Sequence, residues 1–226
     1  MAVIKICGLS REEDIAAVNE AGPDYCGFII DFPKSHRNVT IGQVRALREK
    51  LSDAIVPVGV IVDQPVEKAA MLLNEGIVDV IQLHGHEDEI YIKQLRNLLE
   101  KSNSVYAQCE HNADRKKQIW KAFKIQCCSD LEIAAVSSAD AIVLDNGYGT
   151  GETIDWSILA DAKDLMKEKQ IFLAGGLTPD NIEEAVRQLG VWGIDISSGV
   201  ETDQKKDREK ILAAVEAAGR AGGNKQ

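Results

Sequence analysis

The chain has 226 residues, and its 36 acidic and 26 basic side chains give it a formal net charge of −10. Apolar residues make up 45% of the sequence and charged residues 27%, a balance typical of globular proteins with a large buried core. The acidic excess argues against nucleic acid as the main partner, because phosphate binding requires clustered Lys and Arg. No apolar run reaches the roughly 18 residues that a membrane span requires, so no membrane partner is expected.

The cysteines and the N-terminal segment indicate a cellular compartment. Five cysteines, an odd number without regular spacing, do not form a disulfide framework. The segment from Met1 to Gly8 is strand-like and has neither a basic region nor a cleavage site. We therefore expect a cytoplasmic, reduced protein.

Short apolar runs alternate with amphipathic segments of helical length along the whole chain. Eight such units in one chain of this size favour a single-domain α/β fold, the (β/α)8 or TIM barrel, over residues 1–226. An open doubly wound sheet shares the alternation and is the alternative. The expected strands are Val3–Cys7, Tyr25–Ile30, Val56–Val62, Val78–His84, Ile119–Ile125, Asp140–Asp145, Ile171–Ala174 and Gly193–Ser197. The expected helices are Arg11–Ala21, Ile41–Leu51, Val66–Glu75, Glu87–Lys101, Ser129–Ser137, Trp156–Lys169, Pro179–Leu189 and Asp207–Ala218.

Two segments do not fit the repeating pattern. Residues 100–118 are polar and irregular, and we interpret them as an insertion before the fifth strand, on the side away from the expected mouth of the barrel. Val105–Ala107 within this segment is the alternative for the fifth strand. Residues 219–226 are expected to form a frayed C-terminal tail.

Polar residues occur in strand positions that both faces of a parallel barrel should bury. Taken singly, each is more often a hydrogen-bonded core residue than a functional one. Four strands, however, carry polar groups toward their carboxyl ends, where such barrels perform chemistry. Alternation along the strands predicts that Lys5 and Asp195 pair inside the barrel, because their strands become neighbours on closure. The polar residues are Lys5, Cys7, Gln82, His84, Asp145, Asp195 and Ser197.

Glycine-containing turns follow the last two predicted strands, at Gly175-Gly176 and Ser198-Gly199. Backbone N–H groups in such turns can approach an anion closely, and this is where many barrels of this type bind phosphate. A third glycine-containing segment, Asn146–Gly151, follows the sixth strand and has the composition of a mobile lid. A phosphorylated small molecule is therefore the expected ligand.

The motifs, in this order and spacing, resemble the phosphoribosylanthranilate isomerase family of tryptophan biosynthesis. The resemblance covers nearly the whole chain except residues 100–118. The matching pieces are Lys5-Ile6-Cys7-Gly8-Leu9, Gly27-Phe28, Pro33-Lys34-Ser35-His36-Arg37, Val58-Gly59-Val60, Gln82-Leu83-His84-Gly85, Leu144-Asp145, Gly149-Thr150-Gly151 with Asp155-Trp156, Ala174-Gly175-Gly176-Leu177, and Asp195-Ile196-Ser197-Ser198-Gly199-Val200-Glu201.

The resemblance implies a cofactor-independent Amadori rearrangement of a phosphosugar that carries an anthranilate group. It implies that Cys7 is the general base and Asp145 the general acid, and that Arg37 binds the anthranilate carboxylate. His84 would line the pocket. By the same resemblance, Gly175, Gly176, Ser198 and Gly199 would cradle the phosphate, and Gly149, Thr150 and Gly151 would belong to the lid. Cys7 must be activated to act as a base near neutral pH, and Asp145 must hold a proton there, which a partly dry pocket or a nearby anion would favour.

Several observations leave alternatives open. Tyr148 stands where the family usually has glycine, which puts the closing of the lid in doubt. His84 and His86 lack a nearby third ligand, so no metal site is expected. The pair Cys127-Cys128 is interpreted as ordinary small-residue packing. Another phosphosugar-converting barrel enzyme, or a binding scaffold without catalysis, remains possible at this stage, and the expected oligomeric state is a monomer or a homodimer.

Overall fold

The computed structural model describes residues 2–103, 116–145, 156–161 and 169–221. Eight parallel strands form a closed barrel in the order β1-β9-β8-β7-β6-β5-β4-β2, because β1 pairs with both β9 and β2. This closure confirms the (β/α)8 prediction and excludes the open doubly wound sheet. The barrel strands are β1 (Val3–Cys7), β2 (Tyr25–Ile30), β4 (Val56–Ile61), β5 (Val80–Leu83), β6 (Gln118–Lys124), β7 (Ala141–Asp145), β8 (Gln170–Ala174) and β9 (Gly193–Ile196).

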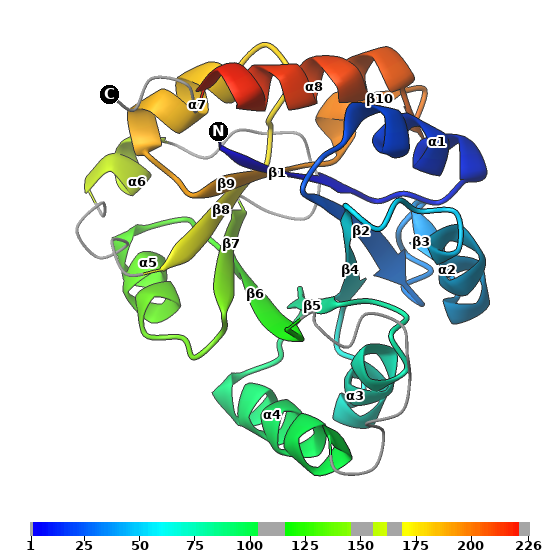
Figure 1. Cartoon of the computed structure of the whole chain (residues 1–226). Helices are drawn as coiled ribbons and strands as arrows, with labels where there is room; N and C mark the ends of the chain where they lie inside the picture. Colours follow the sequence, from blue (N-terminus) through cyan, green and yellow to red (C-terminus); the bar gives the residue numbers. More distant parts are fainter. Residues whose placement is uncertain (1, 104–115, 146–155, 162–168, 222–226) are drawn as a thin grey trace.

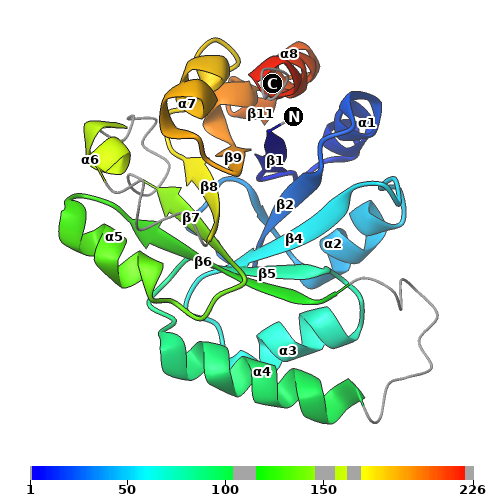
Figure 2. The same ribbon diagram turned by 60° about the vertical axis from the view of Figure 1, so that its left-hand side comes forward.

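The α-helices lie around the outside of the strands, as Figures 1 and 2 show from two directions. Their apolar faces and the outward faces of the strands share one large buried cluster, which is the main core of the protein. The helices are α1 (Glu12–Ala21), α2 (Ile41–Arg48), α3 (Val66–Asn74), α4 (Glu89–Asn103), α5 (Cys128–Ala135), α6 (Trp156–Asp161), α7 (Ile182–Leu189) and α8 (Arg208–Ala221). Within the described ranges, none is both long and apolar enough to cross a membrane.

Three short strands were not predicted, because two-residue segments show no periodicity. β3 (Asn38–Val39) pairs with the end of β2. β10 (Glu201–Thr202) and β11 (Lys205–Lys206) form a small antiparallel hairpin between β9 and α8. The turn η1 (Ser198–Val200) leads from β9 into this hairpin.

The predicted start of the seventh helix, at Pro179, is wrong by three residues. α7 begins at Ile182, and the residues before it form a turn held by the side chain of Asn181. The Asn181 amide accepts a hydrogen bond from the backbone N–H of Thr178 (2.8 Å) and donates one to the carbonyl of Gly176 (3.0 Å). This turn therefore braces the glycine loop that follows β8.

The irregular segments are described only in part. α4 extends to Asn103 and β6 begins at Gln118, while residues 104–115, with the competing strand Val105–Ala107, lie outside the described residues. The expected lid residues Gly149, Thr150 and Gly151, together with Tyr148, also lie outside them. α8 continues to Ala221, so residues 219–221 of the expected tail are helical.

Candidate active site

The barrel interior is divided into an apolar part and a polar part. Four aromatic rings pack together in the apolar part, with ring centroids 4.4 Å apart for Trp120 and Phe172 and 4.8 Å apart for Tyr25 and Trp120. Tyr25 is the first residue of β2, and Trp192 directly precedes β9, so these rings fill the amino-terminal part of the barrel. The polar side chains follow later in their strands, which leaves the carboxyl ends for the site.

Lys5 and Asp195 form the predicted buried ion pair, with Nζ 2.6 Å from Oδ2. Burial alone would lower the pKa of the Lys5 ammonium, but Asp195 and Cys7 outweigh it and raise that pKa above its ordinary value. The second carboxylate oxygen of Asp195 and the side-chain oxygen of Gln82 are buried without a hydrogen-bond partner among the described residues. Both side chains line a cavity at the carboxyl ends of the strands.

A cavity of about 470 Å³ opens at the carboxyl ends of the strands. It brings together seven of the predicted site residues, which come from six different strand ends and loops: Cys7, Arg37, His84, Asp145, Gly175, Gly176 and Ser198. Gly199 does not line the cavity. A Cβ atom at Gly199 would lie 1.8 Å from the carbonyl oxygen of Leu177, so this glycine allows the loops after β8 and β9 to pack closely.

Cys7 is buried at the end of β1, with 8% of its surface exposed. Burial raises the pKa of its thiol above the ordinary value, and the nearby Lys5 ammonium opposes that shift. Gly27 on the neighbouring strand β2 lies directly against the thiol, because a Cβ there would be 2.7 Å from Sγ of Cys7 and 3.1 Å from Cε of Lys5. The thiol and the Lys5 side chain therefore converge over the same glycine.

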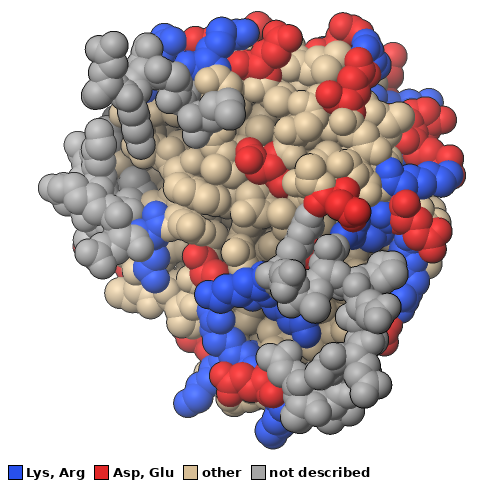
Figure 3. All heavy atoms as spheres, viewed as in Figure 1, with Lys and Arg blue, Asp and Glu red and all other residues tan. Residues whose placement is uncertain are grey.

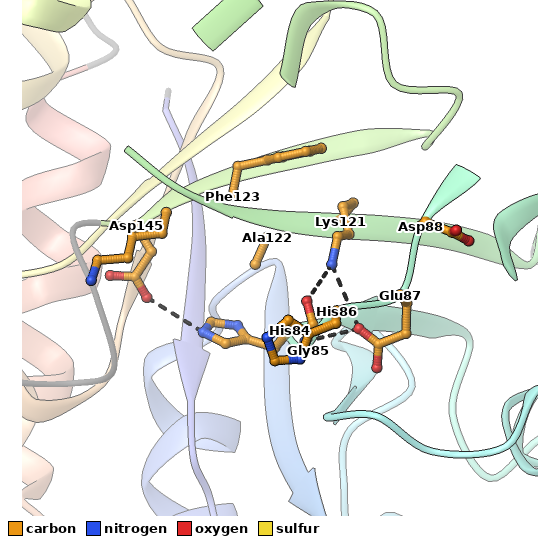
Figure 4. A pocket seen from close by; sticks show the side chains of 10 residues that line it. His84, Gly85, His86, Glu87, Asp88, Lys121, Ala122, Phe123 and Asp145 are labelled. Carbon is orange, nitrogen blue, oxygen red and sulfur yellow. Dashed lines mark hydrogen bonds and ion pairs between the residues drawn. The ribbon is translucent and has the colours of Figure 1, made fainter. Parts of the chain in front are cut away.

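His84 lies beside Asp145 in the cavity. Its Nε2 lies 3.6 Å from Oδ2 of Asp145, and Figure 4 shows the ring turned toward that carboxyl group. The amide nitrogen of Gln82 lies 3.3 Å from Nδ1 and can donate to it, which places the ring proton on Nε2, facing Asp145. Burial lowers the pKa of His84, although Asp145 opposes the shift, so the imidazole is neutral at pH 7.

A second cavity, of about 350 Å³, adjoins the first and shares His84 and Asp145 with it. Its wall is the turn after β5, which Lys121 of β6 and Glu87 hold together (Figure 4). Nζ of Lys121 donates to the carbonyl of Gly85 (2.7 Å) and lies 3.5 Å from Glu87, whose carboxylate accepts from the N–H groups of Asp63 and Gly85. This lysine and glutamate thus fix the turn that follows His84.

Arg37 reaches the cavity from the loop between β2 and β3, and its guanidinium is paired with Glu201. Nε and Nη2 of Arg37 lie 2.6 and 2.7 Å from the two carboxylate oxygens. Glu201 also accepts from Nζ of Lys206 at 2.6 Å. Glu201 is the last residue of a motif in the sequence analysis, but no role was predicted for it. Lys206 was not predicted at all, because the sequence does not indicate that it contacts Glu201 beside the loop that carries Arg37.

No metal site is found among the described residues: they contain no group of three or more His, Cys, Asp or Glu side chains placed to hold an ion. His86 is exposed and contacts Asp63 at 3.1 Å rather than joining His84. Cys127 and Cys128 are exposed at the start of α5, where the Asp130 carboxylate accepts a hydrogen bond from the backbone N–H of Cys127. The space-filling view shows acidic and basic side chains around the edge of the molecule, with a group of Lys and Arg side chains below the centre of the view (Figure 3).

Fold and site together define a (β/α)8-barrel enzyme whose cavity holds a thiol, a carboxyl group and glycine loops at the strand ends. Residues 4–217 match the model of the N-(5'-phosphoribosyl)anthranilate (PRA) isomerase family. The chain belongs to this family.

Named relatives agree with this assignment over nearly the full length. The chain is 37% identical over 216 residues to N-(5'-phosphoribosyl)anthranilate isomerase of Clostridium acetobutylicum, which covers 93% of this chain and 95% of the relative. Phosphoribosyl anthranilate isomerase of Thermotoga maritima is similar in structure, with a TM-score of 0.80, 28% identity, and coverage of 97% of this chain and all of that one. A structure of the isomerase in complex with reduced 1-(o-carboxyphenylamino)-1-deoxyribulose 5-phosphate gives a TM-score of 0.79 at 27% identity, covering 97% of this chain and all of that one.

Proposed function

We propose that this chain converts N-(5-phosphoribosyl)anthranilate to 1-(2-carboxyphenylamino)-1-deoxyribulose 5-phosphate, with Cys7 as general base and Asp145 as general acid. The observation that carries the proposal is the shared cavity. A thiol at the end of β1 and a carboxyl group at the end of β7 line one cavity, and glycine loops adjoin it. Family membership supplies the reaction, and the two groups are of the types that the reaction requires.

The chemistry needs two protons delivered and two removed, and we assign the first of each to Asp145 and Cys7. Asp145 gives a proton to the ribose ring oxygen as the C1–O bond breaks, which opens the ring to an iminium ion. The Cys7 thiolate then removes the proton from C2 and leaves an enolamine. Tautomerisation to the aminoketone adds one proton at C1 and removes one from the C2 hydroxyl, so the whole reaction is balanced without an added reagent.

The surroundings of Cys7 suit a base that is ionised in only a fraction of molecules. Burial raises the pKa of the thiol, so the neutral thiol dominates at pH 7. Lys5 and Lys206 lie close enough to favour the thiolate once it forms. Because the thiol retains a high pKa, the thiolate is a strong proton acceptor when it meets the C2 proton.

Neutral His84 supports the role of Asp145. An imidazole that carries its proton on Nε2 can donate to the carboxylate that remains after Asp145 has released its proton. A protonated, positively charged imidazole would instead favour the ionised form of Asp145 before the reaction begins. The burial that keeps His84 neutral therefore favours an acid that still holds its proton.

Two groups of residues would orient the ends of the substrate. Gly175, Gly176 and Ser198 lie in the loops after β8 and β9, where backbone N–H groups can bind the phosphate. Arg37 lies on the same cavity wall as Cys7 and offers its remaining N–H groups to the anthranilate carboxylate. The ribose would then lie between Cys7 and Asp145.

The test is a fluorescence assay that follows the loss of the phosphoribosylanthranilate signal with the purified protein. We expect Cys7→Ala and Asp145→Asn each to lower kcat by about a hundredfold or more, a typical loss for a general base or acid. Matched controls are Cys26→Ala, a buried cysteine on the neighbouring strand β2, and Asp140→Asn, at the opposite end of the Asp145 strand. An inactive wild-type protein would reject the function, and near-normal turnover of either site variant would reject that residue's role.

A further inference from the structure

The Arg37 guanidinium is held on one edge by a residue of the chain itself. Glu201 contacts Nε and Nη2 of Arg37 through its two carboxylate oxygens, at 2.6 and 2.7 Å. Such a bidentate pair fixes the plane of the guanidinium as well as its position. These two hydrogen bonds use Nε and one N–H of Nη2. The N–H groups of Nη1 and the second N–H of Nη2 can therefore donate to another anion.

Glu201 also forms an ion pair with a second cation, Lys206. Lys206 is buried, and its Nζ lies 2.6 Å from Oε1 of Glu201 and donates to the carbonyl of Ser197 at 2.8 Å. Burial alone would raise the pKa of Glu201, but Arg37 and Lys206 outweigh it and lower the pKa to about 2. The carboxylate is therefore ionised throughout the neutral range and holds two cations at once.

Three loops meet at this cluster. Arg37 belongs to the loop after β2, whereas Glu201 and Lys206 face each other across the β10–β11 hairpin after β9. The stem of Arg37 packs on Gly8, in the loop after β1, since a Cβ there would lie 2.4 Å from Cδ of Arg37. The cluster thus fixes Arg37 relative to Cys7, which directly precedes Gly8.

We propose that Glu201, braced by Lys206, is the positioning residue that orients Arg37 and so determines the preference for a substrate with an acidic aryl group. The inference rests on the proposed function and names the residues that give it specificity. Without the negative charge of Glu201, as in Glu201→Gln, the cationic groups of Arg37 and Lys206 would repel each other, with His36 nearby. Arg37, which lines the cavity, would then lose the contact that fixes the plane of its guanidinium.

The experiment is a double-mutant cycle with Glu201→Gln and Arg37→Ala, read as KM and kcat separately. We expect E201Q to raise KM about tenfold to a hundredfold, the range for a lost hydrogen bond to a charged group, with a smaller change in kcat. In the R37A background, E201Q should add little, because the residue that it positions is gone. The control is Glu183→Gln, which removes an exposed pair with Arg220 on α7 and α8.

Specificity gives a readout that a merely structural role would not move. N-(5-phosphoribosyl)aniline lacks the carboxylate, so the wild-type protein should use it much less well than the natural substrate, and E201Q should lose most of this preference. Glu201→Asp keeps the charge and should restore part of the preference, which covers the case that E201Q folds poorly. A wild-type KM in folded E201Q, or an undiminished effect of E201Q in the R37A background, would overturn the inference. An inactive wild-type protein would instead overturn the proposed function, and the inference with it.

Discussion

The two sides of the cavity are built from different kinds of polar group. The base side, around Cys7, contains two sets of paired charges, Lys5 with Asp195 and Glu201 with Arg37 and Lys206. The acid side, around Asp145, contains the neutral side chains of His84 and Gln82, together with Lys121 and Lys124, which line the second cavity with Asp145. The charges close to Cys7 are thus paired within the protein, whereas the imidazole that faces Asp145 is neutral.

This difference fits the roles that we propose for the two sides. The base side must favour an anion at Cys7 and, as proposed, hold the anionic end of the substrate, and both tasks need cations in fixed places. In the proposed mechanism the acid side must keep a proton on a carboxyl group, which a neutral His84 favours more than a protonated imidazole would. Mutations and pH should therefore act differently on the two sides.

The largest expected effect is on stability, from Lys5→Met on the base side. This change leaves the Asp195 carboxylate buried without its cation, which typically costs about 3–5 kcal/mol. The free energy of unfolding, measured with urea, should fall by about that amount. Removing the stranded charge in Lys5→Met/Asp195→Asn should recover much of the loss.

Lys121→Met provides the matched control on the acid side. Lys121 is also buried, but its short contact is a backbone carbonyl, and Glu87 keeps the hydrogen bonds from Asp63 and Gly85. Its loss should be smaller than that of Lys5→Met. Equal losses at the two lysines would contradict the distinction between the two sides.

The next effect is a pH dependence at Cys7. Burial raises the pKa of the thiol above its ordinary value, so the thiolate fraction should increase about tenfold per pH unit from pH 6 to the alkaline range. Alkylation by iodoacetamide, followed for the Cys7 peptide by mass spectrometry, should accelerate accordingly. The exposed Cys127 and Cys128 provide an internal comparison. A rate of alkylation at Cys7 that is constant between pH 6 and pH 8 would show that the thiol is already ionised. That result would contradict a raised thiol pKa at Cys7.

The sequence was sufficient where periodicity and strand order determine position. Alternation along β1 and β9, with closure of the barrel, placed Lys5 against Asp195, and the structure confirms that pair. Periodicity cannot place Lys206 near Arg37, because the contact depends on a two-residue hairpin and on side chains that bridge two loops. The close packing of Gly199 against Leu177 was not predicted either, because a glycine in a loop shows no periodicity, and its predicted contact with the phosphate stays a prediction.

The smallest expected effect is the contribution of His84 to the pH dependence of stability. Its sign is opposite to that of a histidine whose pKa is raised by an ion pair. Its folded-state pKa is lowered by burial, so protons bind the unfolded chain more readily as the pH falls below about 6.5, the ordinary histidine value. The wild-type protein should lose stability between pH 7.5 and pH 5, and His84→Gln should lose less over the same interval. The difference should be a few degrees in Tm, since 1 kcal/mol corresponds to about 2–4 °C in a chain of this size. His86→Gln, at an exposed histidine two residues away, is the control. If His84→Gln lost as much stability on acidification as the wild-type protein, His84 would not be held neutral in the folded state, and the acid side would need a charged partner for Asp145.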